Sequence, residues 1–198
     1  ALAAGLVYMV RANRSLRNRS ETDHLTGLPN RTLLDALLTR EVYRMERSAQ
    51  PFSVAMMDID HFKAINDKFG HPRGDRVLIE MARAFYGATR RSDVIGRWGG
   101  EEFLLILPGT DLPHAFAACE RIRQRIERRR FAGSIGTVTI SAGIAQAIAG
   151  ETADALIWRA DAALYRAKNA GRNRCIADDT VILPTPQDPS GQEPAEAR

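Results

Sequence analysis

The stretch RWGGEEFLLIL, which runs from Arg97 to Leu107, decides how the rest of the sequence is interpreted. Its two adjacent glycines separate two apolar runs, which is a signal of a β-hairpin. Glu101 and Glu102 follow the glycines directly. A buried strand usually avoids adjacent carboxylates, because an unpaired buried charge is costly. In an extended hairpin the two side chains point to opposite faces, so one can bind a ligand while its neighbour has another task.

A second acidic pair ends the segment FSVAMMDID, residues 52–60. This continuous apolar run predicts a buried strand, and Asp58 and Asp60 share one face at its end, where α/β sheets bind ligands. If the two strands are neighbours, Asp58 can face Glu101 or Glu102, and such a cluster suits Mg²⁺ and substrate phosphates. The alternative is that these acids cap helices and pair with nearby bases, with Asp60 capping the helix that begins HFK.

The remaining sequence alternates between helical and strand patterns. Asn30 is a predicted N-cap, Pro51 is expected to break the helix that Asn30 starts, and Gly70 and Gly171 are expected to end two others. Helices are predicted over 31–48, 61–70, about 73–89, about 112–129 and 152–170. Strands are predicted over 52–60 and 136–146, and a strand, a Gly-Gly turn and a second strand over 93–107. Because hairpins occur beside the strand and helix alternation, we predict an α/β (α+β) fold with a mixed central β-sheet flanked by helices.

Composition limits the class of protein and its partners. The chain has 198 residues, enough for one domain and a short appendage. The net charge of +4 suits an anionic ligand but is too small to indicate binding to nucleic acid, so no nucleic-acid partner is expected. Cys119 and Cys175 are isolated, with no CxxC and no nearby histidine, which favours structural thiols in a reducing compartment over a zinc site.

The two ends of the chain differ from its centre. Residues 1–10, ALAAGLVYMV, are apolar and precede several arginines, but ten apolar residues are too few to cross a bilayer. They are either the tail of a transmembrane helix with cytoplasmic arginines or the start of an amphipathic helix. We assign 1–22 to an N-terminal signalling helix, so any membrane contact would involve only this region and what precedes it. Residues 184–198 are predicted to be a disordered tail.

The motifs resemble those of the GGDEF-domain diguanylate cyclases, in the GGEEF variant. The match runs from about Asp23 to Asn173 and indicates a domain over 23–176. The motifs that carry it are DHLTGLPNR (23–31), MMDIDHFKAINDKFGHPRGD (56–75), RWGGEEF (97–103), TISAGIA (139–145) and YRAKNAGRN (165–173).

The resemblance implies a fold like the palm of nucleotidyl cyclases and polymerases, and a role in bacterial signal transduction. It implies that two GTP molecules condense to cyclic di-GMP and release two pyrophosphates, with two Mg²⁺ ions, or Mn²⁺, in each active site. Each domain would hold one GTP, which implies a homodimer with C2 symmetry. It also implies a cytoplasmic domain and leaves open whether the parent protein is anchored in the inner membrane.

The resemblance also assigns catalytic roles to individual residues. Asp58 and Glu101 correspond to the side-chain metal ligands, and Ile59 corresponds to the residue that offers its backbone carbonyl. Glu101 further corresponds to the proton acceptor for the attacking hydroxyl, with Glu102 in a supporting role. Lys63 corresponds to the transition-state stabiliser.

Substrate contacts follow from the same motifs. Asn66 and Asp75 correspond to the residues that read guanine, Leu25 to an apolar wall and His71 to a neighbouring contact. The predicted phosphate contacts are the backbone amides of His61 and Phe62 and the side chains of Lys168 and Arg172. From the residues alone, the segment NDKFGHPRGD would be interpreted as a turn with caps, and cations at a helix C-terminus favour the helix dipole in any case.

The segment RRSD, residues 90–93, matches the family's RxxD inhibitory site. Arg90 and Asp93 would bind cyclic di-GMP and give product inhibition, with Arg121 or Arg123 as a second arginine. The alternative is an arginine at a helix end followed by an aspartate in a turn.

Three functions remain open at this point. The first is an active diguanylate cyclase, and the second is a weakly active GGDEF module that serves as a cyclic di-GMP receptor. The third is a cyclase that makes a mononucleotide ring or a mixed dinucleotide. The intact acidic residues favour the first over the second, and Asn66 and Asp75 favour guanine alone over the third.

Overall fold

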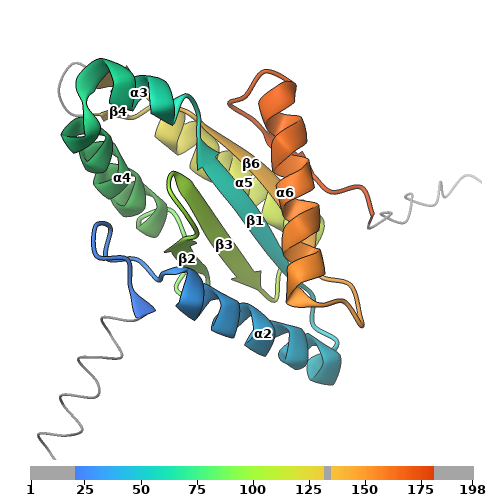
Figure 1. The fold of residues 1–198 in the computed structure, drawn as a ribbon. Coiled ribbons are helices and arrows are strands. Elements are labelled where there is room, and N and C mark those ends of the chain that lie inside the picture. Colours follow the sequence, from blue (N-terminus) through green and yellow to red (C-terminus); the bar gives the residue numbers. More distant parts are fainter. Residues whose placement is uncertain (1–20, 132–134, 181–198) are drawn as a thin grey trace, which may run out of the picture.

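The computed structural model describes residues 21–131 and 135–180 (Figure 1). Most of the predicted signalling helix and the predicted tail over 184–198 lie outside these residues. The elements in chain order are α2 (Arg31–Ser48), β1 (Phe52–Ile59), α3 (Phe62–Phe69), α4 (His71–Tyr86), β2 (Val94–Arg97), β3 (Glu102–Pro108), α5 (Leu112–Glu127), β4 (Arg130–Phe131), β5 (Gly136–Thr137), β6 (Ile140–Gln146), α6 (Ala153–Asn169) and β7 (Cys175–Ala177).

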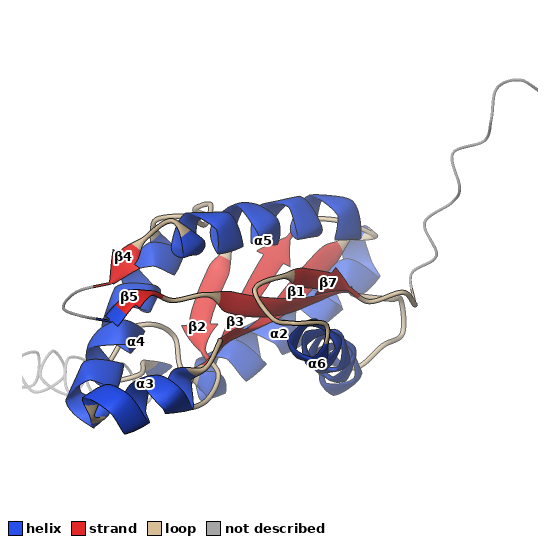
Figure 2. Ribbon diagram, turned by 90° about the horizontal axis from the view of Figure 1, so that it is seen from above, coloured by secondary structure: helices blue, strands red, loops and turns tan. Residues whose placement is uncertain are grey.

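A five-stranded mixed sheet forms the centre of the domain. Its strand order is β2-β3-β1-β6-β7. The pairs β2–β3, β3–β1 and β1–β6 are antiparallel, whereas β7 lies parallel to β6. Figure 2 shows the sheet between helices, with α5 along one face and α2 and α6 along the other. The predicted mixed sheet flanked by helices is confirmed.

Alternation along β1 divides the core between the two faces of the sheet. Ala55 and Met57 join a cluster with α4 and α5, while Val54 and Met56 join a cluster with α2 and α6. Because side chains alternate along a strand, Asp58 continues the second set. Its carboxylate therefore lies on the face of the sheet that α6 covers.

Helix α6 lies unusually close to the sheet at Gly143 in β6. A Cβ atom added to Gly143 would lie 2.1 Å from the Ala160 carbonyl oxygen and 2.1 Å from the Leu164 nitrogen. Only glycine therefore lets the backbones of β6 and α6 come into direct contact. This packing fixes the position of the last turn of α6, which carries Lys168.

Several predicted boundaries differ from the structure. Helix α4 begins at His71 and ends at Tyr86, earlier at both ends than predicted, because Gly70 has a φ of +81° and Pro72 fits the first helical turn. The predicted strand over 136–146 is two strands, β5 and β6. The three-residue strand β7 was not predicted, because its pairing with β6 depends on a partner far away in sequence.

One buried charge was also missed. Arg159 lies among the buried residues of α6, between Leu156 and Ala160, and only 7% of it is exposed. Its guanidinium binds carboxylates of Asp178 (2.7 Å) and Glu151 (2.7 Å) and the carbonyl of Gln146 (2.7 Å). These partners satisfy the buried charge and hold the segment after β7 against the end of β6.

The two cysteines are free and buried. Burial raises the pKa of Cys119 to about 12 and also raises that of Cys175, so neither is a reactive thiolate at neutral pH. Within residues 21–131 and 135–180, no helix has the length and apolar character needed to cross a membrane.

Candidate active site

The two acidic pairs meet at one end of the sheet. Strands β1 and β3 are neighbours, and their register places Asp58 directly opposite Glu102. Residues directly opposite one another share a face, so both carboxylates lie on the α6 side. Glu101 lies in the turn just before β3, and its carbonyl accepts a hydrogen bond from the Ile59 amide (3.4 Å). The sequence left open whether Glu101 or Glu102 faces Asp58, and the strand register shows that Glu102 does.

Lys168 lies within this acidic cluster. Its Nζ atom is 2.8 Å from Oδ2 of Asp58. Burial raises the pKa of Asp58, although the hydrogen bond and charge of Lys168 act in the opposite direction. Burial also raises the pKa of Glu101 and that of Glu102, and the negative charge of Asp58 adds to both shifts. Lys168 contacts Asp58 and acts through its charge on Glu101 and Glu102, so one lysine serves three carboxylates with raised pKa values, which makes the site attractive to further positive charge.

The cluster fits a hard divalent cation that also takes oxygen atoms from a substrate. Carboxylate oxygens are ligands for such ions. Within the described part of the chain, no three acidic, imidazole or thiol side chains lie close enough to hold a metal ion by themselves. A cation bound beside Asp58 would therefore need backbone or substrate oxygens to complete its coordination.

Asp60 has a different role from the one considered for it. It does not cap α3, whose N-cap residue is His61 without a side-chain hydrogen bond. Its carboxylate instead accepts hydrogen bonds from Thr139 Oγ1 (2.7 Å), Ser141 Oγ (2.7 Å) and the Asn173 amide (3.0 Å). Asp60 thus ties the loop after α6 to the end of β1.

The predicted phosphate contacts surround this end of β1. Arg172, in the loop that Asp60 holds, has a φ of +62°, and its positive charge partly opposes the rise that burial causes in the pKa of Asp58. His61 also has a positive φ, of +57°, immediately before α3. Such conformations are costly for residues other than glycine and often occur at functional sites. Phe62 is buried and Lys63 is exposed in the first turn of α3, where backbone amides can bind phosphate.

The predicted guanine contacts lie side by side on α3 and α4. A Cβ atom on Gly74 would lie 1.9 Å from Oδ1 of Asn66, so the Asn66 side chain rests against α4 where glycine leaves room. Asp75 is the next residue on α4 and is exposed. His71 is exposed at the start of α4, and Leu25 is a half-buried residue that packs on the α4 side of the core.

Arg97 anchors the tip of the hairpin and was not singled out by the sequence analysis. Its Nε and Nη2 atoms donate to the Gly100 carbonyl (3.0 and 2.7 Å), and Nη1 donates to both carboxylate oxygens of Asp23 (3.2 and 3.1 Å). Burial favours a raised pKa for Asp23, but hydrogen bonds from Thr26 and Arg97 outweigh it and lower the pKa. Both residues lie within matched motifs, which is the signal that could have identified them.

The RRSD segment forms a turn closed by its own aspartate. Asp93 Oδ2 accepts a hydrogen bond from the Arg90 backbone amide (2.8 Å), as the turn alternative expected. The guanidinium of Arg90 is exposed and has no hydrogen-bond or ion-pair partner among the described residues. Arg123 is held by Glu120 and Asn173, whereas Arg121 is exposed.

The sequence matches a known family over most of the described residues. The family model described as "Diguanylate cyclase, GGDEF domain" matches residues 20–174. Diguanylate cyclase DgcP of Pseudomonas aeruginosa is 46% identical over 160 residues, which cover 80% of this chain and 24% of that protein. Diguanylate cyclase DgcM of Escherichia coli is 40% identical over 167 residues, covering 84% of this chain and 40% of that protein. The chain thus spans less than half the length of these relatives.

Solved structures agree with the sequence comparison. The coiled coil and GGDEF domain of DgcB from Caulobacter crescentus, in complex with c-di-GMP, has a TM-score of 0.84 and 32% identity. The alignment covers 88% of this chain and 94% of that one. Diguanylate cyclase SiaD of Pseudomonas aeruginosa, in complex with its activator SiaC, has a TM-score of 0.79 and 42% identity, and covers 89% and 69% of the two chains. Together with the acidic cluster at the hairpin, these similarities show that the chain belongs to the GGDEF family of diguanylate cyclase domains.

Proposed function

We propose that this domain, over residues 23–176, condenses two GTP molecules into cyclic di-GMP and releases two pyrophosphates. The observation that carries the proposal is the cluster of Asp58, Glu101 and Glu102 beside Lys168, at the end of β1. Phosphoryl transfer depends mainly on positioning and on neutralising charge, which such a cluster supports when divalent cations are bound. The named activity of the curated relatives points to the same reaction.

The residues present fit a magnesium site, with Mn²⁺ as a substitute. We assign the side chains of Asp58 and Glu101 and the backbone carbonyl of Ile59 as ligands, and two ions to each active site. When bound, the ions would lower the charge of the phosphates and favour ionisation of the attacking 3′-hydroxyl. Burial raises the pKa values of Asp58 and Glu101, and like charge adds to each shift, from Asp60 on Asp58 and from Asp58 on Glu101; a bound cation would offset both effects.

The other residues of the site bind and orient GTP. Asn66 and Asp75 would hydrogen-bond the guanine edge, because an amide and a carboxylate complement its donors and acceptor. Leu25 and His71 would border the base. The backbone amides of His61 and Phe62 and the side chains of Lys168 and Arg172 would hold the phosphates. When a cation neutralises the Asp58 carboxylate, Lys168 would leave its contact with Asp58 and bind a terminal phosphate of GTP instead.

Three groups would act on the reacting atoms. Glu101 would accept the proton of the 3′-hydroxyl, a task that suits a carboxylate with a raised pKa. Lys63, free of partners among the described residues, would stabilise the negative charge on the phosphoryl group during transfer. Glu102 would support the site from its position opposite Asp58.

Two copies of the chain are needed for the product. Each domain offers one set of GTP contacts, whereas cyclic di-GMP contains two nucleotides, so two active sites must face each other in a C2 homodimer. Cyclic di-GMP would also inhibit by binding Arg90 and Asp93. Arg121 is the better candidate for the second arginine, because Arg123 is already held by two carboxylates and Asn173.

The proposal is tested by incubating the protein with GTP and Mg²⁺ and identifying the product by mass. Wild type and Glu46→Ala, which alters an exposed acid on α2, should both make cyclic di-GMP. The Glu101→Ala variant should lose activity by about 1,000-fold or more, because it lacks both a metal ligand and the proton acceptor.

Other outcomes would assign a different function. Equal product from wild type and Glu101→Ala would contradict the role of Glu101. No product from wild type, together with tight binding of cyclic di-GMP, would indicate a receptor module. A mixed dinucleotide formed when ATP is added would contradict the assignment of Asn66 and Asp75.

A further inference from the structure

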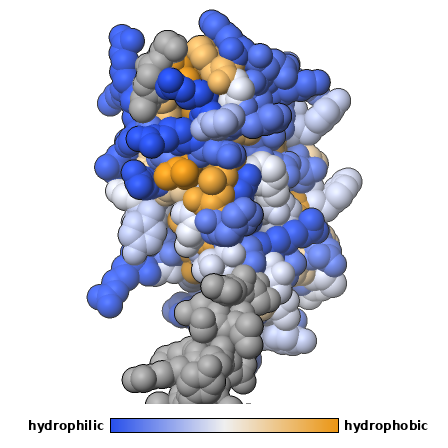
Figure 3. All heavy atoms as spheres, turned by 60° about the vertical axis from the view of Figure 1, so that its left-hand side comes forward, coloured by the Kyte–Doolittle hydropathy of each residue, from blue (hydrophilic) through white to orange (hydrophobic). Residues whose placement is uncertain are grey.

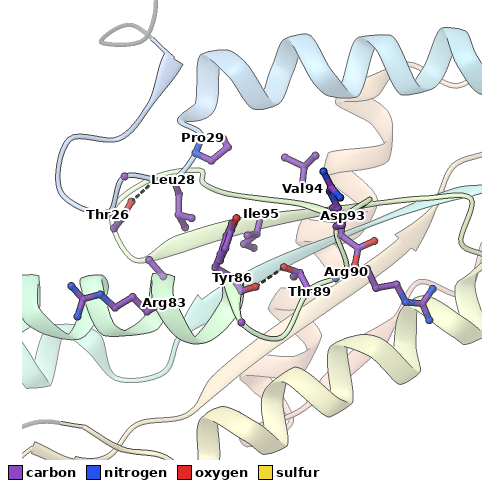
Figure 4. A pocket seen from close by; sticks show the side chains of 14 residues that line it. Thr26, Leu28, Pro29, Arg83, Tyr86, Thr89, Arg90, Asp93, Val94 and Ile95 are labelled. Carbon is purple, nitrogen blue, oxygen red and sulfur yellow. Dashed lines mark hydrogen bonds between the residues drawn. The ribbon is translucent and has the colours of Figure 1, made fainter.

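A pocket of about 710 Å³ lies away from the acidic cluster, and we call it the α4 pocket (Figure 4). Its walls come from residues 26–29, from the C-terminal half of α4, and from the segment 89–95 that includes the RRSD turn and the start of β2. It has the size of a typical small-molecule site. Its lining contains none of the residues assigned to GTP or metal binding.

The lining combines an apolar floor with one exposed aromatic ring. Leu28 and Ile95 are buried residues of the core, whereas Tyr86 is 75% exposed. Figure 4 shows the Tyr86 ring standing upright between Leu28 and Ile95. An aromatic ring that is exposed on the wall of an apolar pocket is a surface on which a flat base can stack.

The polar part of the lining is positively charged. Arg83, Arg90 and Arg91 line the pocket together with one acid, Asp93. Among the described residues, none of the three guanidinium groups has a hydrogen-bond or ion-pair partner. Figure 3, which brings the left-hand side of Figure 1 forward, shows small hydrophobic areas enclosed by hydrophilic side chains on this side of the molecule. The pocket is therefore suited to a ligand that is flat, partly apolar and anionic.

We propose that the α4 pocket receives one guanine base of cyclic di-GMP, stacked on Tyr86, with a phosphodiester of the ligand beside Arg83. The inference rests on the proposed function, which supplies the ligand and places Arg90 and Asp93 in its inhibitory site. It extends that site to two residues outside the RxxD motif. A cyclic dinucleotide fits because it combines flat bases with two anionic phosphodiesters, which match the excess of arginine over acid in the lining.

The pocket also borders the loop that holds the catalytic hairpin. Thr26 and Pro29 line the pocket, and Thr26 is bound to Asp23 through its amide (2.8 Å) and its hydroxyl (2.7 Å). Asp23 binds Arg97, which binds the Gly100 carbonyl at the hairpin tip. A ligand in the α4 pocket thus contacts a loop that is joined to the active site by a short chain of hydrogen bonds.

The test is direct binding of cyclic di-GMP, measured by titration calorimetry without GTP. Tyr86→Ala should weaken binding about tenfold or more, because it removes the stacking surface, whereas Tyr86→Phe should stay within about twofold of wild type. Tyr165→Ala is the matched control, since Tyr165 is a similarly exposed tyrosine (67%) on α6, outside the pocket. Circular dichroism and thermal melting would verify that each variant is folded.

The outcomes separate this inference from the proposed function. Unchanged binding by Tyr86→Ala would overturn the inference. This holds even if Arg90→Ala weakens binding, because the ligand would then contact the RRSD turn without entering the α4 pocket. Absence of binding by wild type would overturn it as well. Synthesis of cyclic di-GMP from GTP is assayed separately, so a failure of the proposed function would be recognised by itself.

Discussion

Arg97 is the residue that connects the tip of the hairpin between β2 and β3 to the start of the domain. Its guanidinium reaches the Gly100 carbonyl on one side and the Asp23 carboxylate on the other, and its side chain is 16% exposed. The planar fork of arginine can bind both partners at once, which a lysine ammonium cannot do in the same geometry. In the proposed reaction, Arg97 would be a positioning residue, because it would act through the hairpin that carries Glu101.

We predict that Arg97→Lys lowers kcat by about 10- to 100-fold, since a displacement of about 1 Å at a catalytic group can have such an effect. The KM for GTP should change less, because the residues assigned to guanine binding lie on α3 and α4. Steady-state kinetics of GTP turnover measure both constants.

Two further variants make the prediction specific to the Arg97–Asp23 contact. Asp23→Asn should have a similar effect, and the double variant should be little worse than either single one, because both changes break the same contact. Arg40→Lys, which alters an exposed arginine on α2, serves as the control. A wild-type kcat in Arg97→Lys would show that the hairpin tip is held by other contacts.

At the scale of the elements, the contact between β6 and α6 determines where Lys168 lies. Gly143 has no room for a side chain, because backbone atoms of Ala160 and Leu164 occupy the position of its Cβ atom. A backbone contact cannot be relieved by rotating a side chain, so a larger residue must displace the helix. The same helix carries Lys168 to Asp58 and Arg159 to Asp178.

We therefore predict that Gly143→Ala destabilises the domain by about 3 kcal/mol, which corresponds to a fall in Tm of roughly 10 °C. Chemical denaturation and calorimetry measure the two quantities. Gly87→Ala is the control, because a Cβ atom there would meet its nearest neighbour at 3.4 Å. Its stability should stay within about 0.5 kcal/mol of wild type. Equal stability of the two variants would show that α6 can move away from β6 without cost.

At the scale of the whole molecule, the proposed reaction needs two chains. The residues proposed to bind GTP can hold one GTP molecule in each chain. Cyclic di-GMP is made from two nucleotides, which must lie antiparallel to each other. Product formation should therefore depend on the association of chains as well as on the concentration of GTP.

We predict that the rate per chain falls on dilution below the dimer dissociation constant, because monomers hold GTP without an opposing nucleotide. Initial rates over a series of protein concentrations, with molar mass measured by light scattering on the same samples, test this expectation. A constant rate per chain where scattering finds only monomers would contradict the dimer.

Local chemistry made much of the fold predictable from the sequence. Asn30 caps α2 with its side chain, as predicted, because such a cap depends only on residues a few positions apart. The Gly-Gly pair before Glu101 indicated the hairpin, and the apolar run of β1 indicated a buried strand, for the same reason. Family motifs with fixed spacing then supplied the identity of the candidate site residues.

The sequence by itself determined the order and type of most elements and named the candidate site residues. Only the tertiary structure decided that Asp58 faces Glu102, that Asp60 binds Thr139, Ser141 and Asn173, and that Lys168 pairs with Asp58. These contacts join residues far apart in the chain, and they depend on strand register and on how closely a helix approaches the sheet. Local propensity carries no information about either, because both are fixed only when the strands and helices pack together.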